Sequence, residues 1–209
     1  MTYPTFDEEN LLWKKGYKHI AGVDEVGRGC FAGPVVTAAV ILPDNFTSIK
    51  PINDSKVLSP KIRKELAGVI KQQAIAFAIS EVSVKVINNI GIGKSTQQSF
   101  RQAIKNLAKR PDFILIDAFY IQHLSRKNQK PIIHGDGISI SIAAASILAK
   151  VYRDELMEKL DKKYEIYDFA TNKGYGTRKH REAIKKHGLC NLHRKSFDLS
   201  KFVNLENEL

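Results

Sequence analysis

The sequence predicts an α/β fold in which helices flank a mixed central sheet, followed by a basic helical extension at the C-terminus. Three observations support this prediction. Apolar runs rich in β-branched residues are interspersed with segments of helical spacing. The first two runs are separated by a turn so short that an antiparallel hairpin is the simplest connection. The 209 residues are 43% apolar and 26% charged, as in an ordinary globular domain.

The N-terminal part is predicted to contain one helix and the first two strands. Residues 6–15 have an amphipathic pattern, with Phe6 and Trp13 among the apolar positions, and predict a short helix. Residues 20–26 and 34–42 predict strands. The glycine-rich turn at 27–33 joins them as an antiparallel hairpin.

The middle of the chain adds two helices and one strand. Ser59 followed by Pro60 is typical of a helix start, and this helix is predicted to run to about residue 73. Residues 74–84 predict a strand, and the apolar spacing of residues 95–109 predicts a helix. The sequence GIGKST at 91–96 ends like a phosphate-binding loop, but it lacks the first glycine of that motif. It is therefore predicted to be a loop and a helix cap.

The last part of the predicted sheet ends in acidic residues. Residues 113–116 are wholly apolar and end at Asp117, which predicts a buried strand with a site at its tip. Residues 131–133 predict one more strand, and residues 138–160 the longest helix. We expect residues 1–209 to form a single domain, with a catalytic core at about 18–165 and the basic helical extension at about 166–209.

The charge of the chain indicates a polyanionic partner. There are 33 Lys and Arg residues against 22 Asp and Glu, which gives a net charge of +11 and favours nucleic acid or an anionic membrane surface. Two distant cysteines exclude a disulfide scaffold and a structural zinc site. No apolar run has the length of a membrane span, and the N-terminus does not resemble a secretory leader. We therefore expect a soluble cytoplasmic protein.

Four acidic residues stand out because they adjoin apolar segments. Asp24 and Glu25 end the first predicted strand, Asp117 ends a later one, and Asp136 lies in a Gly-Asp-Gly turn before the longest helix. Neighbouring strand residues point to opposite faces, so Asp24 and Glu25 can share a site only where the strand twists or ends. The alternatives are an exposed acidic pair before a turn and, for Asp136, a helix cap.

Converging carboxylates would repel one another unless a cation neutralised them. Mg²⁺ and Mn²⁺ prefer oxygen ligands, and two such ions about 4 Å apart form a site that cleaves phosphodiesters. An acidic site in a strongly basic chain is thus the pattern of a metal-dependent nuclease.

Eight motifs follow one another along the chain: GVDEVGRG (22–29), AGPVVTAAVIL (32–42), NDSK (53–56), LIDAF (115–119), HGD (134–136), IAAASILAKVYRD (142–154), KGYGT (173–177) and HRKSF (193–197). In this order they resemble the motifs of the bacterial ribonuclease HII family. The resemblance implies an RNase H-like fold and an endonuclease that cuts the RNA strand of RNA–DNA hybrids. It also implies nicking of duplex DNA 5′ of embedded single ribonucleotides, which belongs to ribonucleotide excision repair, with Mn²⁺ or Mg²⁺ as cofactor and a monomeric enzyme.

The resemblance also implies roles for individual residues. The metal-binding acids of the family fall on Asp24, Glu25, Asp117 and Asp136. The turn that senses the 2′-hydroxyl falls on Gly27, Arg28 and Gly29, and the tyrosine that packs on the sugar at the RNA-to-DNA junction falls on Tyr175.

Several positively charged residues are expected to contact phosphates. We expect this of Arg28, Lys56 and Lys150, whereas Arg153 and Asp154 are expected to lie on a solvated helix face or to form structural ion pairs. The family often has a second lysine after NDSK, where this chain has Val57.

Two residues near the predicted site receive structural or supporting roles. His134 is expected to act from beside the site or at the surface. Cys30 has no accompanying base, so it is expected to be a small packing residue.

Three other functions compete with this one. Ribonuclease HIII has the same acids but an extra N-terminal domain and no Gly-Arg-Gly form. A hybrid-binding module would use the acids only for caps and ion pairs, and would bind without cleaving. A polynucleotide transferase of the same fold should carry long insertions, which this chain lacks.

Overall fold

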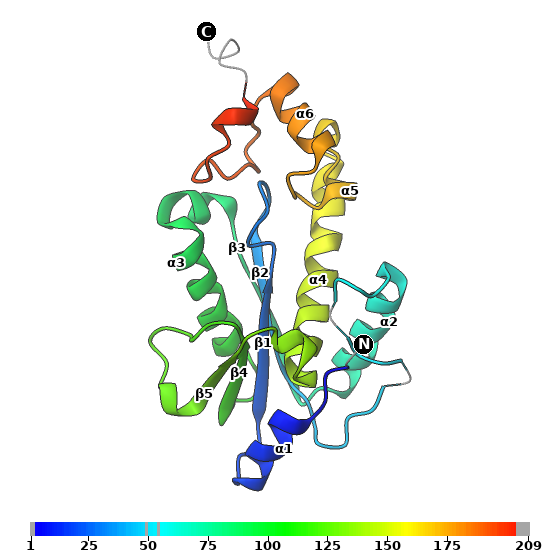
Figure 1. The fold of residues 1–209 in the computed structure, drawn as a ribbon, viewed down its shortest axis with the longest axis vertical. Helices are drawn as coiled ribbons and strands as arrows, with labels where there is room; N and C mark the ends of the chain where they lie inside the picture. The colour runs from blue at the N-terminus through cyan, green and yellow to red at the C-terminus, as the bar shows by residue number, and fades with distance from the viewer. Residues whose placement is uncertain (1–2, 49, 54, 204–209) are drawn as a thin grey trace.

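The computed structural model describes residues 3–48, 50–53 and 55–203, and its centre is the predicted mixed sheet (Figure 1). The strands lie in the order β3-β2-β1-β4-β5. β1 and β2 pair antiparallel, as do β2 and β3, whereas β4 is parallel to β1 and to β5. The strands are β1 (Ile20–Val26), β2 (Val35–Ile41), β3 (Ala76–Val82), β4 (Phe113–Asp117) and β5 (Gln129–Ile132). The hairpin predicted for the first two strands is confirmed.

Helices cover both faces of this sheet (Figure 1). α3 packs on β2 and β3, while α4 packs on β1 and β2 on the other face, with α2 outside it. The hydroxyl of Ser59 accepts the N–H of Ile62 and caps α2 at the predicted place. The helices of this body are α1 (Asp7–Lys14), α2 (Pro60–Gln73), α3 (Val84–Lys105) and α4 (Ile140–Asp161).

The crossing of β1 and α4 depends on Gly22. A Cβ atom at this position would lie 2.0 Å from the carbonyl carbon of Ser141, so only glycine allows the helix to approach so closely. The contact is made next to Asp24, and it therefore fixes α4 beside the acidic end of β1.

α3 differs from the prediction. It begins at Val84 rather than near residue 95, and Gly91 (φ 78°, ψ 160°) interrupts it with a non-helical conformation. Residues 92–96, predicted to be a loop and cap, are helical, so that prediction is wrong. The reason is that Ser83 caps a helical segment before Gly91, and the non-helical conformation of Gly91 places a kink between this segment and the one that follows it.

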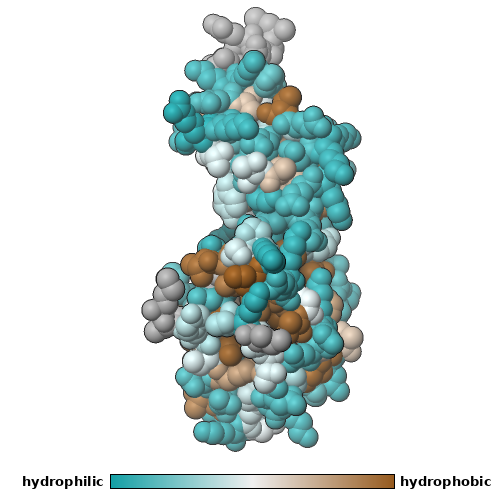
Figure 2. Space-filling model, turned by 90° about the vertical axis from the view of Figure 1, so that its right-hand side faces the viewer, coloured by the Kyte–Doolittle hydropathy of each residue, from teal (hydrophilic) through white to brown (hydrophobic). Residues whose placement is uncertain are grey.

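The C-terminal part lies beyond the end of β1 and contains α5 (Phe169–Asn172) and α6 (Arg178–His187) (Figure 1). It encloses its own apolar cluster, which also takes in Ala32 and Met157 from the body. Figure 2 shows a hollow at mid-height between this part and the body, on a surface that is mostly hydrophilic. The predicted helical extension is therefore present, while the division of the chain near residue 165 stays a prediction. None of the described helices combines the length and apolar character that a membrane span needs.

Candidate active site

The candidate active site begins at Asp24, near the C-terminal end of β1. Its side chain is 4% exposed, and its Oδ1 accepts the N–H of Glu25 at 2.7 Å. Ser146, on α4, adds a side-chain hydrogen bond. Burial, and then the neighbouring Glu25, raise the pKa of Asp24 well above its usual range. No positively charged side chain of the described residues is among the causes of this shift.

Glu25 reaches the same site because β1 ends at Val26, one residue later. Burial raises the pKa of Glu25 to about 7; Arg28 opposes this shift and Asp117 adds to it. The Oε2 atom is buried and accepts no hydrogen bond from the described residues. Glu25 can therefore share a site with Asp24, because the strand ends directly after these two residues.

Asp117 ends β4, the strand that lies parallel to β1. Its Oδ1 accepts the backbone N–H of Gly135 at 2.8 Å, which joins it to the turn before α4. Burial raises the pKa of Asp117, and Asp136 adds to the shift, while the hydrogen bond from Gly135 opposes it. The two parallel strands therefore bring their terminal carboxylates together, as expected at the carboxyl edge of an α/β sheet.

Asp136 lies in the turn at Gly135–Gly137 and is 5% exposed. The cap of α4 is Ser139, whose hydroxyl accepts the N–H of Ile142 at 3.2 Å, so the alternative of Asp136 as the cap is wrong. The Nζ of Lys56 lies 3.2 Å from Oδ2 of Asp136. His134 is exposed and contributes to lowering the pKa of Asp117.

These four carboxylates form one electrostatic group. Glu25, Asp117 and Asp136 each raise the pKa of Asp24, and the donor atoms that they offer are all carboxylate oxygens. Such a set fits hard divalent cations. Within the described ranges, however, no group of three or more His, Cys, Asp or Glu side chains is arranged so that it could hold a metal ion as it stands. The site is therefore an open acidic group rather than a preformed cage.

The Gly-Arg-Gly turn follows directly after these acids. Gly27 has φ 92°, and a Cβ atom there would lie 2.1 Å from Nε of the buried Arg153. Gly29 is exposed, and a Cβ atom there would meet no protein atom within 4 Å. The guanidinium of Arg28 lies 4.6 Å from the ring centroid of Phe119. Gly27 thus serves the fold, while Gly29 faces open space.

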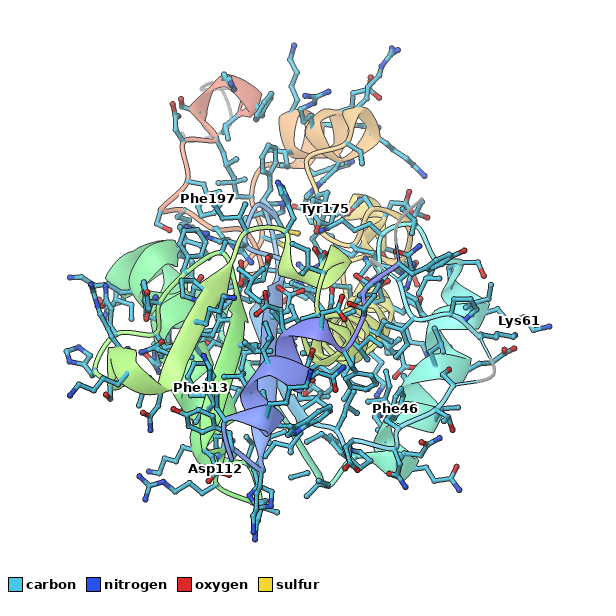
Figure 3. All side chains as sticks on the ribbon, turned by 60° about the horizontal axis from the view of Figure 1, so that its bottom comes forward. Phe46, Lys61, Asp112, Phe113, Tyr175 and Phe197 are labelled. Carbon is cyan, nitrogen blue, oxygen red and sulfur yellow. The ribbon has the colours of Figure 1, made fainter. Side chains whose placement is uncertain are left out.

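Tyr175 lies at the end of the molecule that carries α6, as Figure 3 shows. Its ring is 41% exposed, its hydroxyl is hydrogen-bonded to Cys30, and burial raises the pKa of Tyr175 to about 12. The neighbouring Gly174 accepts hydrogen bonds from the N–H groups of Phe31 (2.8 Å) and Ala32 (3.2 Å). The tyrosine is therefore fixed against the turn of residues 27–34 rather than held on a free segment.

The predicted phosphate contacts have different surroundings. Lys56 is largely exposed beside Asp136, within reach of a ligand at the acids. Lys150 is 15% exposed and forms an ion pair with Asp154 at 2.7 Å, so the structure gives it a structural partner. Arg153 lies neither on a solvated face nor in an ion pair with a described residue, but is buried and donates to three backbone carbonyls. Asp154 forms structural ion pairs, as expected. Asp54, in the NDSK motif, lies outside the described residues.

The family model of ribonuclease HII matches residues 21–200, which include all the carboxylates described above. The chain belongs to this family. Ribonuclease HII of Desulfitobacterium hafniense (strain DSM 10664 / DCB-2) is 50% identical over 190 residues, covering 91% of this chain and 72% of the relative. As a member of the ribonuclease HII family, the chain is a hydrolase, an RNase H endonuclease that acts on RNA–DNA hybrids.

Solved structures have the same fold. Ribonuclease H2 from Pyrococcus horikoshii OT3 superposes with a TM-score of 0.73 at 24% identity, covering 88% of this chain and 95% of that chain. Bst-RNase HIII in complex with Mn²⁺ superposes with a TM-score of 0.68 at 21% identity, covering 88% and 68%. The predicted RNase H-like fold is confirmed.

The sequence did not indicate several residues that hold this ribonuclease HII site in place. Ser146 lies on the small-residue face of α4, where nothing in the pattern separates it from packing residues. Arg194 is a charged residue in a basic stretch of the sequence, but it is fully buried. His180 and His193 are buried too, with 3.1 Å between their Nε2 atoms. The HRKSF motif was the one available signal for Arg194 and His193.

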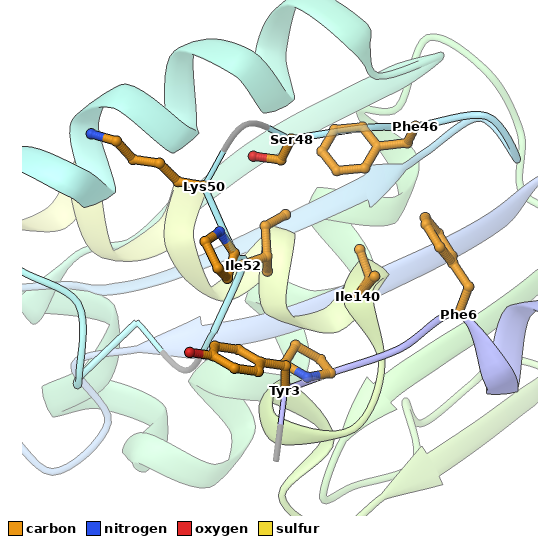
Figure 4. Close-up of a pocket in the computed structure, with 9 residues that line it drawn as sticks. Tyr3, Phe6, Phe46, Ser48, Lys50, Ile52 and Ile140 are labelled. Carbon is orange, nitrogen blue, oxygen red and sulfur yellow. The ribbon is translucent and has the colours of Figure 1, made fainter. Parts of the chain in front are cut away.

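A separate pocket lies between the N-terminal arm and the segment before α2 (Figure 4). Its lining is mainly apolar and includes Tyr3, Phe46, Ile52 and Ile140. None of the four acids lines it, so it does not belong to the site.

Proposed function

We propose that Asp24, Glu25, Asp117 and Asp136 bind two divalent cations, Mn²⁺ or Mg²⁺, and that the chain hydrolyses phosphodiesters with their help. The observation that carries this proposal is the convergence of four carboxylates whose charges repel one another at the ends of β1 and β4. The open arrangement suits ions that keep water and take substrate oxygens as further ligands. A structural relative, Bst-RNase HIII, is known in complex with Mn²⁺.

Two ions held by these carboxylates would supply an activated water and stabilise the charge on the phosphate. The water oxygen forms a bond to phosphorus as the bond to the 3′-oxygen breaks, giving a 3′-hydroxyl and a 5′-phosphate. Asp24 and Asp117 hold their positions through the N–H groups of Glu25 and Gly135. Lys56 is placed to contact the phosphate, because its ammonium already lies beside Asp136.

The substrates are the RNA strand of hybrids and single ribonucleotides in duplex DNA, which are nicked on the 5′ side. The acids alone do not distinguish RNA from DNA, since both have the same phosphates. The 2′-hydroxyl makes the difference, and it both donates and accepts hydrogen bonds. Gly27, Arg28 and Gly29 follow the acids directly, so a ribose held by this turn lies beside the metals. Tyr175, fixed against the same loop, is placed to pack on the next deoxyribose.

The decisive experiment uses a labelled DNA duplex that contains one ribonucleotide, incubated with and without Mn²⁺. We expect one nick 5′ of the ribonucleotide in Mn²⁺, and none in EDTA or on the all-DNA duplex. Binding without cleavage would instead identify a hybrid-binding module. Monomeric state and cytoplasmic location stay predictions of the sequence.

A further inference from the structure

The loop of residues 27–34 is hydrogen-bonded to the side chain of Arg194, which lies 166 positions after Arg28 in the sequence. The Arg194 side chain is fully buried, and its Nη1 donates to the carbonyl oxygen of Arg28 at 2.8 Å. Its Nε and Nη2 donate to the carbonyl of Gly33 at 3.0 and 2.8 Å. One guanidinium thus connects both ends of the loop.

Backbone hydrogen bonds hold the segment around Arg194 against this loop. The N–H of Arg194 donates to Phe31 and the N–H of Gly33 donates to Leu192, both at 2.8 Å, around a bridge between Ala32 and His193. The C-terminal segment therefore runs antiparallel to the loop, and the direction of the Arg194 side chain is fixed.

A second buried cation supports the same loop. Arg153 donates to the carbonyls of Pro34 (3.0 Å), Ala32 (3.1 Å) and Lys173 (2.8 Å). Among the described residues, no carboxylate forms an ion pair with Arg153 or Arg194. Burial lowers the pKa of Arg194 to about 10, so it remains a cation at neutral pH. Five carbonyl groups hold these two charges.

The bond to Arg28 has a geometric consequence at Gly29. The carbonyl of Arg28 and the N–H of Gly29 belong to one planar trans peptide unit, in which the two groups point in opposite directions. Holding the carbonyl toward Arg194 therefore directs the N–H away from it. That N–H forms no hydrogen bond with any residue that the structure describes, and Gly29 faces open space.

We propose that Arg194 is a positioning residue that aims the Gly29 N–H at the 2′-oxygen of the ribose. The C-terminal HRKSF segment thereby takes part in sugar selection through the backbone, without touching the substrate. The inference rests on the proposed function, because it assumes that the turn at 27–29 reads the sugar.

The test compares two substrates, a duplex with one ribonucleotide and the same duplex with a 2′-fluoro-2′-deoxynucleotide, which accepts hydrogen bonds far more weakly. Arg194→Lys keeps the charge but cannot reproduce the planar set of bonds. We expect it to lower kcat/KM at least tenfold on the ribonucleotide and much less on the 2′-fluoro duplex. The matched control is Lys195→Gln, an exposed neighbour that should change both substrates equally and within about twofold.

Equal losses on both substrates would show that Arg194 supports only the fold, and would overturn the inference. The rise in Tm on adding Mn²⁺ should remain in Arg194→Lys, because the acids are intact. If the wild type binds Mn²⁺ but cleaves neither duplex, the proposed function fails instead.

NMR measurements test the positioning independently of activity. The Gly29 amide resonance should shift in Arg194→Lys and stay unchanged in Lys195→Gln. If Arg194→Lys does not fold, Arg194→Gln, which keeps one donor, replaces it. A scalar coupling across the hydrogen bond between Arg194 Nη1 and the Arg28 carbonyl tests the contact in the wild type. Its absence would contradict the inference.

Discussion

At the scale of single residues, the site combines acids that repel one another with backbone groups that hold them in place. The N–H groups of Glu25 and Gly135 each donate to one carboxylate, and these bonds oppose only part of the cost of burial. A site built in this way is less stable without cations than with them. The metal-free protein should therefore gain stability when one acid loses its charge.

Asp24→Asn should lower the cleavage rate by several orders of magnitude, while the Tm of the variant in EDTA stays the same or rises. Removing the charge relieves repulsion with Glu25, and removing a ligand weakens Mn²⁺ binding. The stabilisation by Mn²⁺, measured as a shift in Tm, should therefore shrink. Asp44→Asn, at an exposed position, serves as the control and should change neither property. Full activity of Asp24→Asn at saturating Mn²⁺ would contradict the assignment.

Tyr175→Ala should lose more activity on the duplex with one ribonucleotide than on a long RNA–DNA hybrid. The side chain is half-exposed beside the turn at 27–29, and we expect its ring to pack against a deoxyribose and to crowd a 2′-hydroxyl. Tyr175→Phe keeps the ring and loses only the hydrogen bond to Cys30, so it should retain most of the preference. Ratios of kcat/KM on the two substrates measure this. Equal losses on both would leave the ring a general positioning element.

At the scale of elements, the acidic strand ends could be predicted from the sequence, whereas the start of α3 and the cap of α4 could not. The apolar runs of β1 and β4 end in acids, and this pattern is visible in the sequence. The first segment of α3, from Val84 to the kink at Gly91, was missed, because the apolar spacing in the sequence indicated a helix only from about residue 95. The alternative for Asp136 could not be decided, since an acid before a helix commonly caps it and only the structure shows Ser139 in that role.

The N-terminal helix α1 supports the site from outside through Glu9. This carboxylate is fully buried, and its Oε1 accepts the hydroxyl of Ser139 at 2.6 Å and the N–H of Ser141 at 3.0 Å. It thus lies at the positive end of α4, directly after the turn that carries Asp136.

Glu9→Ala should destabilise the protein by about 2 kcal/mol, because it leaves buried donors without an acceptor. Urea unfolding followed by circular dichroism measures the change. Glu8→Ala is the control, because Glu8 forms only a partly exposed ion pair with Lys130 and should cost less than about 1 kcal/mol. A value near zero for Glu9→Ala would show that α1 is not needed to order the start of α4.

At the scale of the whole molecule, a chain with a net charge of +11 carries a small acidic site. Binding of a duplex should depend mainly on contacts with phosphates. If about six or more Lys and Arg neutralise phosphates, affinity for a hybrid should fall roughly a thousandfold or more between about 50 and 200 mM salt. Fluorescence anisotropy with a catalytically inactive Asp117→Asn variant measures this. A dissociation constant that does not change with salt would refute this view of binding.

The C-terminal part should lose stability in mild acid because of His193. Burial and the neighbouring His180 lower the pKa of His193 to about 4, whereas the unfolded chain binds this proton near pH 6.5. Its contribution, on the order of 3 kcal/mol, is therefore complete above about pH 6.5 and is lost as the pH falls toward 4. Glu25 acts in the opposite direction, because its folded pKa of about 7 lies above the unfolded value.

The measurement must separate these two effects. The free energy of unfolding at pH 7 minus that at pH 5 should be smaller in His193→Gln than in the wild type. His187→Gln, an exposed histidine on α6, should leave the difference unchanged. An unchanged difference in His193→Gln would show that this histidine does not respond to pH as its burial implies.

The hydrogen bond between Arg194 and Arg28 also has a consequence for folding and synthesis. Arg194 lies 166 residues after Arg28, so their hydrogen bond can form only when nearly the whole chain has been synthesised. A ribosome releases Asp24, Glu25, Asp117 and Asp136 long before Arg194. A nascent chain could therefore assemble its acids while its sugar-reading turn still lacks its support. We expect selectivity for ribose to be the last property that the enzyme acquires.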